Sequence, residues 1–224
     1  MNMGNIELKG KKCILFGANS VLGINLINHL SGLGVDIGLI DIRGRELSLN
    51  FPQESVIPGD ERSFKKAIEN LIAQLGGMDF LILSYYFDEL KSYPNTLNLE
   101  RWELIRKSWV DSYFLCAKNV APWFIENKFG RIIFFNTLAG YTGEGEGEGE
   151  LITENSSIYE CGASSAITGM MTSIARQIIP LGVSVNGIAI NSNYMKDLKR
   201  INDAVDLWLS GRCEYACGQI LRVY

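Results

Sequence analysis

Histidine, paired cysteines and long apolar runs are scarce in this chain of 224 residues, and each absence removes a class of function. The single histidine, His29, excludes a histidine-rich metal site. It also argues against a Ser-His-Asp triad, because it lies in a helical stretch far in sequence from any candidate nucleophile. The cysteines contain no Cys-x-x-Cys pair, and although Cys213 and Cys217 are spaced to share a helix face, two ligands do not make a zinc site. We therefore expect a reduced chain with no metal site.

Signals for export, membranes and nucleic acid are also missing. Residues 1–12 contain no apolar segment typical of a signal peptide. No apolar run approaches the roughly 20 residues of a membrane span. The formal net charge is −4, whereas nucleic acids and anionic membranes are bound through clustered lysine and arginine. We expect a cytoplasmic protein that binds neither.

The composition is that of a globular chain, with 47% hydrophobic and 21% charged residues. The length favours a single domain over residues 1–224. One segment of low complexity, Gly143 to Glu150, alternates glycine and glutamate. It has no apolar side chain to bury, so we expect a flexible acidic surface loop there.

Apolar runs alternate with stretches of helical periodicity along the whole chain. The runs predict strands over residues 12–16, 35–40, 55–57, 80–83, 131–135, 183–190 and 219–223. The periodic stretches predict helices over residues 22–33, 64–75, 100–127, 160–179 and 203–209. Such alternation is typical of an α/β fold, here a single-domain, Rossmann-type, doubly wound parallel sheet with helices on both faces.

The first strand is followed by a glycine turn that opens a helix, which is the pattern of a phosphate-binding loop. The turn runs from Gly17 through Asn19 and Ser20 to Gly23. Asp41 ends the second strand, where a dinucleotide fold places the carboxylate that binds the adenosine ribose. These residues favour NAD over NADP, although the neighbouring Arg43 weakens that preference. The alternative interpretation is a tight turn and a solvated aspartate.

The order of segments from about Lys11 to Val223 resembles the short-chain dehydrogenase/reductase family. The matching pieces occur in the family's order. They are Gly17, Asp41, Gly59-Asp60, Gly77-Met78-Asp79, Trp102, Phe114, Pro122, Gly130 to Ile133, Gly169, Ser173 to Ala175, Val185-Asn186 and Gly218-Gln219. The resemblance implies a dinucleotide cofactor held by the glycine turn, Asp41 and Asp60.

Several positions depart from the pattern of that family. Val21 replaces the middle glycine of the first turn, so two methyl groups stand where the family's backbone approaches the pyrophosphate. Tyr85 and Tyr86 stand where the family has small residues beside the cofactor, and Trp109 falls on the family's structural asparagine. We therefore expect NAD to bind weakly or not at all.

The catalytic positions implied by the resemblance are also changed. The family's serine falls on Thr137, its tyrosine on Glu160 and its lysine on Ser164. A register shifted by one residue places Tyr159 at the tyrosine position but Ala163 at the lysine position. Without the lysine, a tyrosine of pKa about 10 is ionised to roughly one part in a thousand at pH 7, a cost of about 4 kcal/mol. Glu160 is more simply explained as an acidic residue in the first turn of a helix.

The resemblance also implies subunit contacts, through the long helix with Trp109, Tyr113 and Phe124 and the helix with Ala163, Ala166, Gly169 and Met170. The C-terminal segment from Cys213 to Tyr224 matches a further contact of the family. The leading hypothesis is a non-catalytic subunit that pairs with an active paralogue in a heteromeric NAD-dependent dehydrogenase, such as a 3-hydroxyacyl-CoA type, or that forms a homo-oligomer. Two alternatives stay open: an active NAD-dependent oxidoreductase using Thr137, Tyr159 or Glu160, and a regulator that senses a dinucleotide through Asp41 and Asp60.

Overall fold

The computed structural model describes residues 8–42, 44, 49–85, 97–142, 158–190, 198–213 and 215–223. The strands are β1 (Lys12–Phe16), β2 (Asp36–Ile42), β3 (Gln53–Val56), β4 (Phe80–Leu83), β5 (Gly130–Thr137), β6 (Val183–Ile190) and β7 (Ile220–Val223). The helices are α1 (Val21–Gly32), α2 (Glu61–Leu75), α3 (Leu99–Ile105), α4 (Ser112–Asn127), α5 (Ala139–Thr142), α6 (Ile158–Ile178) and α7 (Leu198–Leu209). A π-helical turn, η2 (Arg106–Asp111), joins α3 to α4, and a 3-10 turn, η3 (Ile179–Leu181), follows α6.

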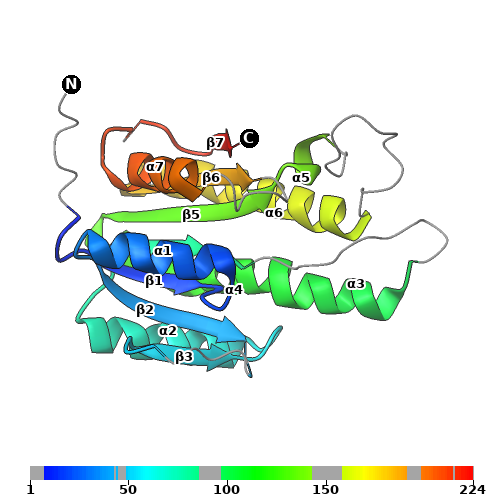
Figure 1. Cartoon of the computed structure of the whole chain (residues 1–224), viewed down its shortest axis with the longest axis horizontal. Coiled ribbons are helices and arrows are strands. Elements are labelled where there is room, and N and C mark those ends of the chain that lie inside the picture. Colours follow the sequence, from blue (N-terminus) through cyan, green and yellow to red (C-terminus); the bar gives the residue numbers. More distant parts are fainter. Residues whose placement is uncertain are drawn as a thin grey trace.

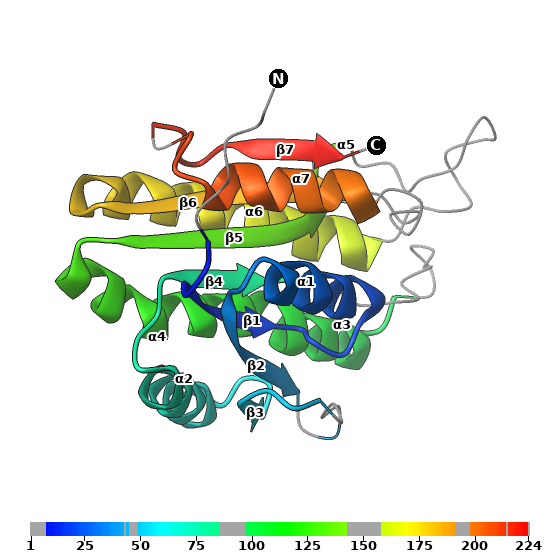
Figure 2. The ribbon, with the colours of Figure 1, turned by 60° about the vertical axis from the view of Figure 1, so that its left-hand side comes forward.

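These strands form one parallel sheet in the order β3-β2-β1-β4-β5-β6-β7 (Figure 1). Helices cover both of its faces, with α1 and α7 on one side and α2, α4 and α6 on the other (Figure 2). In β1, Ile14 and Phe16 point into one core, and Cys13 and Leu15 point into the other. A strand buried on both faces needs such a continuous apolar run. The expected doubly wound α/β fold is confirmed.

Strand order reverses direction between β1 and β4, because the chain winds from β1 toward β3 and then from β4 toward β7. Ligands of open α/β sheets bind outside the carboxyl ends of the strands at this kind of switch point. The glycine turn after β1, the segment after β4 and Thr137 at the end of β5 all lie at this edge. The candidate site is therefore built here.

The helix expected over residues 100–127 is interrupted by the π turn η2. One extra residue enters the helix there, and Ser112 compensates by donating a hydrogen bond from its hydroxyl to the carbonyl oxygen of Lys107, five residues earlier, at 2.9 Å. The turn leaves Trp109 and Tyr113 both fully buried in the core between the helix and the sheet. Apolar periodicity does not reveal a single inserted residue, so the sequence did not predict the turn.

Three smaller expectations differ from the structure. The short helix α5 after β5 was not predicted, and α7 begins five residues before the expected start. Cys213 and Cys217 do not share a helix face, because both follow the end of α7. All five cysteines lie in the described part of the chain and are free thiols, of which Cys13 and Cys116 are buried.

Two further searches cover only the residues with described positions. No helix among them is long and apolar enough to cross a bilayer. No group of three or more histidine, cysteine, aspartate or glutamate side chains among them is placed to hold a metal ion. The acidic loop expected over residues 143–150 and the residues Arg43 and Tyr86 lie outside the described residues.

Candidate functional site

The glycines of the first turn are required by the packing of the backbone itself. Gly17 has φ of +90°, and a Cβ atom there would lie 2.4 Å from the backbone nitrogen of Tyr85. A Cβ atom on Gly23 would lie 2.4 Å from the carbonyl oxygen of Gly17. Both contacts are far below van der Waals distance, so no other residue fits at either position without a backbone shift. The two glycines bring the turn, α1 and the end of β4 into direct contact.

The start of α1 is capped by its own sequence. The Ser20 hydroxyl accepts a hydrogen bond from the backbone nitrogen of Gly23 at 2.9 Å and donates one to the carbonyl oxygen of Gly17 at 3.1 Å. Val21, the first residue of the helix, leaves 46% of its surface exposed. An apolar branched side chain therefore stands at the helix start, where the dipole would favour an anion.

Asp41 is 6% exposed and holds the glycine turn against the end of β2. Its Oδ2 accepts a hydrogen bond from the backbone nitrogen of Asn19, and its Oδ1 accepts one from that of Ile42, both at 2.7 Å. The expected cofactor residues Asn19 and Asp41 thus contact each other. Asp60 has a different position and role, because its carboxylate caps α2 by accepting from the backbone nitrogen of Arg62 at 3.0 Å.

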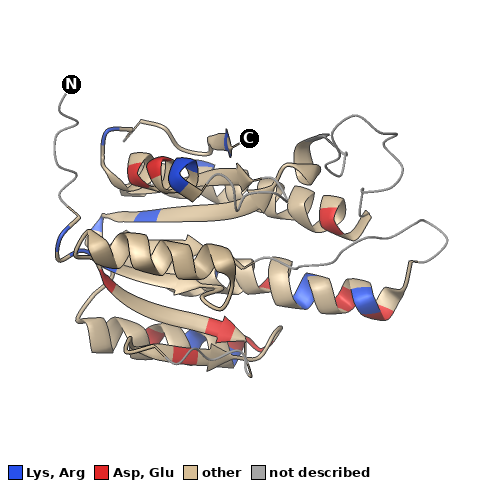
Figure 3. Ribbon diagram, in the orientation of Figure 1, with Lys and Arg blue, Asp and Glu red and all other residues tan. Residues whose placement is uncertain are grey.

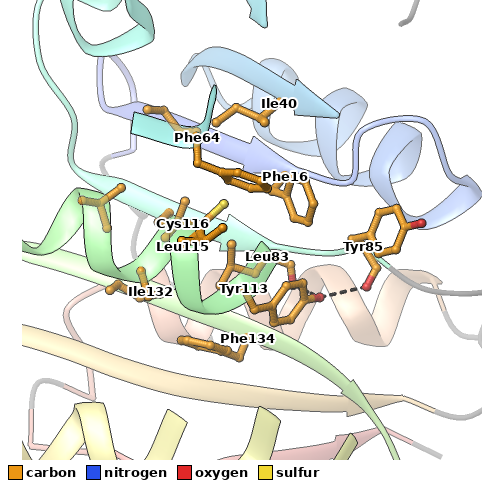
Figure 4. Close-up of a cluster of buried hydrophobic side chains, with 14 of the residues drawn as sticks. Phe16, Ile40, Phe64, Leu83, Tyr85, Tyr113, Leu115, Cys116, Ile132 and Phe134 are labelled. Carbon is orange, nitrogen blue, oxygen red and sulfur yellow. Dashed lines mark hydrogen bonds between the residues drawn. The ribbon is translucent and has the colours of Figure 1, made fainter. Parts of the chain in front are cut away.

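Tyrosine side chains fill the space beside the ends of β4 and β5 (Figure 4). Tyr85 is buried, and its ring stacks on Phe16 with centroids 5.4 Å apart. The Tyr113 hydroxyl lies 2.7 Å from the carbonyl oxygen of Leu83, 2.9 Å from that of Tyr85 and 3.2 Å from that of Phe135. Burial raises the pKa of Tyr113 well above its ordinary value. Tyr113 therefore serves as a neutral link between strand ends.

Thr137 and Ser164, the positions that the resemblance assigns to a serine and a lysine, bond to each other. The Thr137 hydroxyl donates to the Ser164 hydroxyl at 3.2 Å. The Ser164 hydroxyl in turn donates to Oδ1 of Asn136 at 2.5 Å and also lies 3.0 Å from the carbonyl oxygen of Thr137. Ser164 is fully buried, and the other two are nearly so. The hydroxyls therefore join α6 to the end of β5.

Helix α5 closes over this pair. A Cβ atom on Gly140 would lie 2.3 Å from the Ser164 hydroxyl oxygen, so the backbone of α5 packs directly on Ser164. The neighbouring Ser165 hydroxyl donates to the carbonyl oxygen of Gly140 at 3.0 Å. A long side chain at position 164 has no path past α5. The serine at this position thus belongs to a packed helix contact, which no sequence pattern indicated because α5 itself was not predicted.

Of the two candidates for the tyrosine position, Tyr159 turns away from Thr137 toward the start of α3. The Tyr159 hydroxyl accepts a hydrogen bond from the backbone nitrogen of Asn98 at 2.5 Å and donates one to its carbonyl oxygen at 3.1 Å. Tyr159 is buried and joins the start of α6 to the start of α3, whereas Glu160 is half-buried in the first turn of α6. None of the nine tyrosines in the chain is followed by a lysine four residues later.

A polar network around Asn136 was not expected from the sequence. The Asn136 side-chain nitrogen donates to the carbonyl oxygen of Ser164 at 2.8 Å and to the hydroxyl of Thr168 at 2.7 Å. The Thr168 hydroxyl also lies 2.9 Å from the hydroxyl of Tyr141, whose pKa is raised by burial, and the Arg222 guanidinium stands over the Tyr141 ring. The sequence feature that could have indicated this network is Asn136 itself, a polar residue directly after the apolar run from Ile132 to Phe135.

The described residues fit the two halves of a dinucleotide unequally. The half expected to hold adenosine keeps its glycines and a carboxylate at the end of β2, although Asp41 already bonds the turn. The half expected to hold nicotinamide has no lysine for the ribose, and its serine and lysine positions bond to each other. The residues of the nicotinamide half therefore do not fit that group.

Comparisons with known proteins agree with this architecture. A sequence profile described as short chain dehydrogenase matches residues 11–194. The 3-oxoacyl-[acyl-carrier-protein] reductase FabG of Aquifex aeolicus is 23% identical over 82% of this chain and 74% of its own length. The NAD(+)-dependent 2-dehydro-3-deoxy-L-rhamnonate dehydrogenase of a Sphingomonas strain is 22% identical over 80% of this chain and 70% of its own.

Among solved structures, NAD+-bound xylitol dehydrogenase superposes with a TM-score of 0.82 at 16% identity. The superposition covers 97% of this chain and 98% of that protein. It shows that the fold is shared over nearly the whole chain. With the profile match over most of the sequence, the chain belongs to the short-chain dehydrogenase family.

Proposed function

We propose that this chain is a non-catalytic subunit of the short-chain dehydrogenase fold, which pairs with an active paralogue in a heteromeric NAD-dependent dehydrogenase. The observation that carries the proposal is the closed contact at Ser164. The resemblance assigns this position to a lysine that faces the substrate and the ribose. Here the residue is a serine that is fully buried and hydrogen-bonded to Asn136 and Thr137. The chain would contribute a scaffold, and its partner would supply the complete site.

The support for a partner comes from exposed apolar side chains. Of the residues expected at a subunit contact, Trp109, Tyr113, Phe124 and Ala163 are fully buried in the chain's own core, whereas Ala166 and Gly169 are exposed. Different residues of the same helices remain uncovered. Leu99, Phe114 and Ile125 on α3 and α4 and Ile158 on α6 are exposed, which is typical of a protein contact surface.

The substrate class of the heteromer follows only by analogy. The relatives named above act on a 3-oxoacyl group carried by a protein and on a sugar acid. A 3-hydroxyacyl thioester is therefore one candidate for the active partner.

A second candidate, a regulator that binds a dinucleotide without reacting, is favoured by one observation. The turn from Gly17 to Gly23 keeps the backbone geometry that the fold requires beside a helix start, and Asp41 lies at its side. The ligand would have to replace the hydrogen bond between Asp41 and Asn19 or share the carboxylate. Absence of NADH and ADP-ribose binding at millimolar concentration would exclude this candidate.

The third candidate, an enzyme with rearranged chemistry, has less support. The Tyr159 hydroxyl is bonded to the backbone of Asn98, and the Thr137 hydroxyl is bonded to Ser164. Replacing Thr137 and Tyr159 together should therefore leave the turnover per folded molecule unchanged.

The test of the proposed function is a comparison of three samples: this chain, a paralogue from the same cells that carries the family's catalytic serine, tyrosine and lysine, and the two mixed. We expect the chain alone to oxidise or reduce nothing with NAD(H). We expect the mixture to form one complex in native mass spectrometry, with the paralogue more active or more stable than alone. Turnover by the purified chain alone would refute the proposal.

A further inference from the structure

A pocket of about 290 Å³ lies at the edge of the sheet opposite the candidate site, where β5 and β6 begin. Thr137, at the candidate site, ends β5 seven residues after Gly130 begins it, which is roughly 23 Å along a strand. Two neighbouring turns enclose the pocket, one leading from α4 into β5 and the other from η3 into β6. The pocket is therefore separate from the candidate site.

Close backbone packing holds these two turns together. Gly182 ends η3 with φ of +82°, and a Cβ atom there would overlap the carbonyl oxygen of Lys128 in the other turn. Just inside the sheet, Arg131 of β5 and Ser184 of β6 are direct neighbours in the parallel register. The pocket is therefore bounded by main chain whose position the fold sets.

The lining of the pocket is positively charged. Lys128 and Arg131 line it, and the other lining residues are uncharged. Figure 3 shows lysine and arginine in blue at the amino-terminal end of β5. Asp79 is a carboxylate at the same edge of the sheet, but its oxygens accept from the Lys11 ammonium at 3.0 Å and from the backbone nitrogen of Lys12 at 2.9 Å. In a chain of net charge −4, such a pocket favours an anion.

Two polar groups of the lining are open to a ligand. Within the described part of the chain, neither the Lys128 ammonium nor the Ser184 hydroxyl has a hydrogen bond or an ion pair. The Arg131 guanidinium, by contrast, donates to the carbonyl oxygen of Leu209 and stands over the Phe129 ring, 5.5 Å from its centroid. The ammonium and the hydroxyl therefore supply the donors, and the guanidinium adds charge.

The backbone of Lys128 is itself unusual. Lys128 caps the end of α4 with φ of +51°, and no other non-glycine residue in the described ranges has a positive φ. Glycine is the favoured residue at such a helix end, because a Cβ atom strains this conformation. The Lys128 side chain is exposed, so core packing does not explain why a lysine stands there. A binding role for its ammonium does.

Apolar side chains form the rest of the wall. Phe129, Ile179 and Val183 line the pocket, and Ile179 is 41% exposed. A bare inorganic anion would leave this apolar surface uncovered, whereas an anion with an apolar body would cover it. The volume is at the lower limit of about 300 Å³ for small-molecule pockets, which restricts the ligand to a small one.

We propose that this pocket binds a small organic anion. The Lys128 ammonium and the Ser184 hydroxyl bind its carboxylate or phosphate group, and its apolar part packs against Phe129 and Ile179. The proposal goes beyond the proposed function, because it requires neither a paralogue nor a reaction at the candidate site.

Nuclear magnetic resonance titration of the purified full chain tests the proposal, with benzoate and phenyl phosphate as probes. We expect at least one of them to bind with a dissociation constant of about 1 mM or lower. The amide signals of Gly130, Gly182 and Ser184 should shift, and those of Gly17 and Gly23 should not. The tighter of the two probes identifies the anionic group.

Two further probes separate the contributions of charge and apolar contact. Benzamide has the ring of benzoate without its charge and should bind at least about tenfold more weakly than benzoate. Inorganic phosphate has the charge of phenyl phosphate without its ring and should also bind more weakly.

Lys128→Gly is the decisive variant, because binding and stability should move in opposite directions. The dissociation constant should rise at least about tenfold with the loss of a charged hydrogen bond. The Tm should stay the same or rise, since glycine relieves the strain at this φ. Lys128→Arg keeps the charge and should stay within about threefold of the unchanged chain.

Two more variants complete the test. Ser184→Ala removes one neutral hydrogen bond and should raise the dissociation constant by about two- to tenfold. The matched control is Lys66→Ala, which removes an exposed lysine from α2, outside the pocket lining, and should change neither binding nor the shifted signals.

Four results would overturn the proposal. They are no saturable shift with either probe up to about 10 mM, equal binding of benzamide and benzoate, unchanged affinity in Lys128→Gly, and equal losses in Lys128→Gly and Lys66→Ala. Each of them would leave the proposed function intact. Hydride transfer by the purified chain would refute the proposed function and leave this proposal standing.

Discussion

Removing one hydroxyl, in Ser164→Ala, tests whether the contact between α6 and β5 has become part of the core. The hydroxyl is fully buried, donates to Asn136, accepts from Thr137 and lies 3.0 Å from the carbonyl oxygen of Thr137. Without it, the Thr137 hydroxyl loses its acceptor and Asn136 Oδ1 loses one of its donors. Asn136 Oδ1 still accepts from the backbone nitrogen of Thr137 at 3.0 Å. We expect a loss of about 1–3 kcal/mol in the free energy of unfolding.

Urea unfolding and calorimetry measure that loss. For a chain of this size each kcal/mol lowers the Tm by about 2–4 °C. The matched control is Ser165→Ala, the next residue of α6, whose exposed hydroxyl donates to Gly140 at 3.0 Å. Its effect should stay within about 0.5 kcal/mol. Equal effects of the two variants, or none from Ser164→Ala, would refute the assignment of Ser164 to a packed contact.

The same reasoning applies to restoring the family's residue. Ser164→Lys places an ammonium group at a fully buried position against the backbone of α5. Burying an unpaired charge costs several kcal/mol, so we expect little folded protein. A folded Ser164→Lys variant, alone or with Glu160→Tyr, that transfers hydride would show that α5 moves aside.

Other changes test further contacts. Gly17→Ala should lower the free energy of unfolding by more than about 2 kcal/mol, because Gly17 has a positive φ and a Cβ atom there would lie 2.4 Å from the backbone of Tyr85. The control Gly169→Ala meets open space in α6 and should raise the free energy of unfolding by about 0.5–1 kcal/mol. Equal urea midpoints for the two variants would contradict the packing argument. Tyr159→Phe should lower the Tm by several degrees with no change in the far-ultraviolet spectrum, since only the link between α6 and α3 is lost. Burial raises the pKa of the Cys13 and Cys116 thiols above the ordinary value of about 8.5. As the pH rises past that value, these thiols ionise in the unfolded chain but stay neutral in the folded chain. The free energy of unfolding therefore falls, by about 2 kcal/mol per thiol at pH 10. A double alanine variant should lose less stability between pH 8 and pH 10 than the unchanged chain, and an equal loss in both would contradict this assignment.

The alternation of strands and helices was predictable because burial on two faces leaves a direct mark on the sequence. The strands at residues 12–16, 80–83 and 183–190 have the predicted bounds, since most of the positions in each are apolar and buried. The π turn η2 was not predictable, because one inserted residue changes the phase of the helix without removing any apolar position. Helix α5 was missed because four residues carry no periodicity.

The candidate site was predictable in position but not in connectivity. The family resemblance assigned Thr137 and Ser164 to one catalytic site, and in the structure their hydroxyl oxygens lie 3.2 Å apart. It could not show that Tyr159 turns toward α3, because adjacent residues of a helix point about 100° apart and only tertiary contacts select the direction. The role of Asp41 as a brace for the glycine turn likewise depends on a bond between distant residues.

The glycine turn has a consequence for how motifs persist in divergent sequences. Gly17 and Gly23 are held in place by close backbone contacts with Tyr85 and with the turn itself, whatever ligand is present. The requirements of folding alone are therefore enough to explain both glycines. A lysine four residues after a tyrosine has no such second reason to survive. The two glycines of this chain are therefore evidence for the fold and not, by themselves, for a bound dinucleotide.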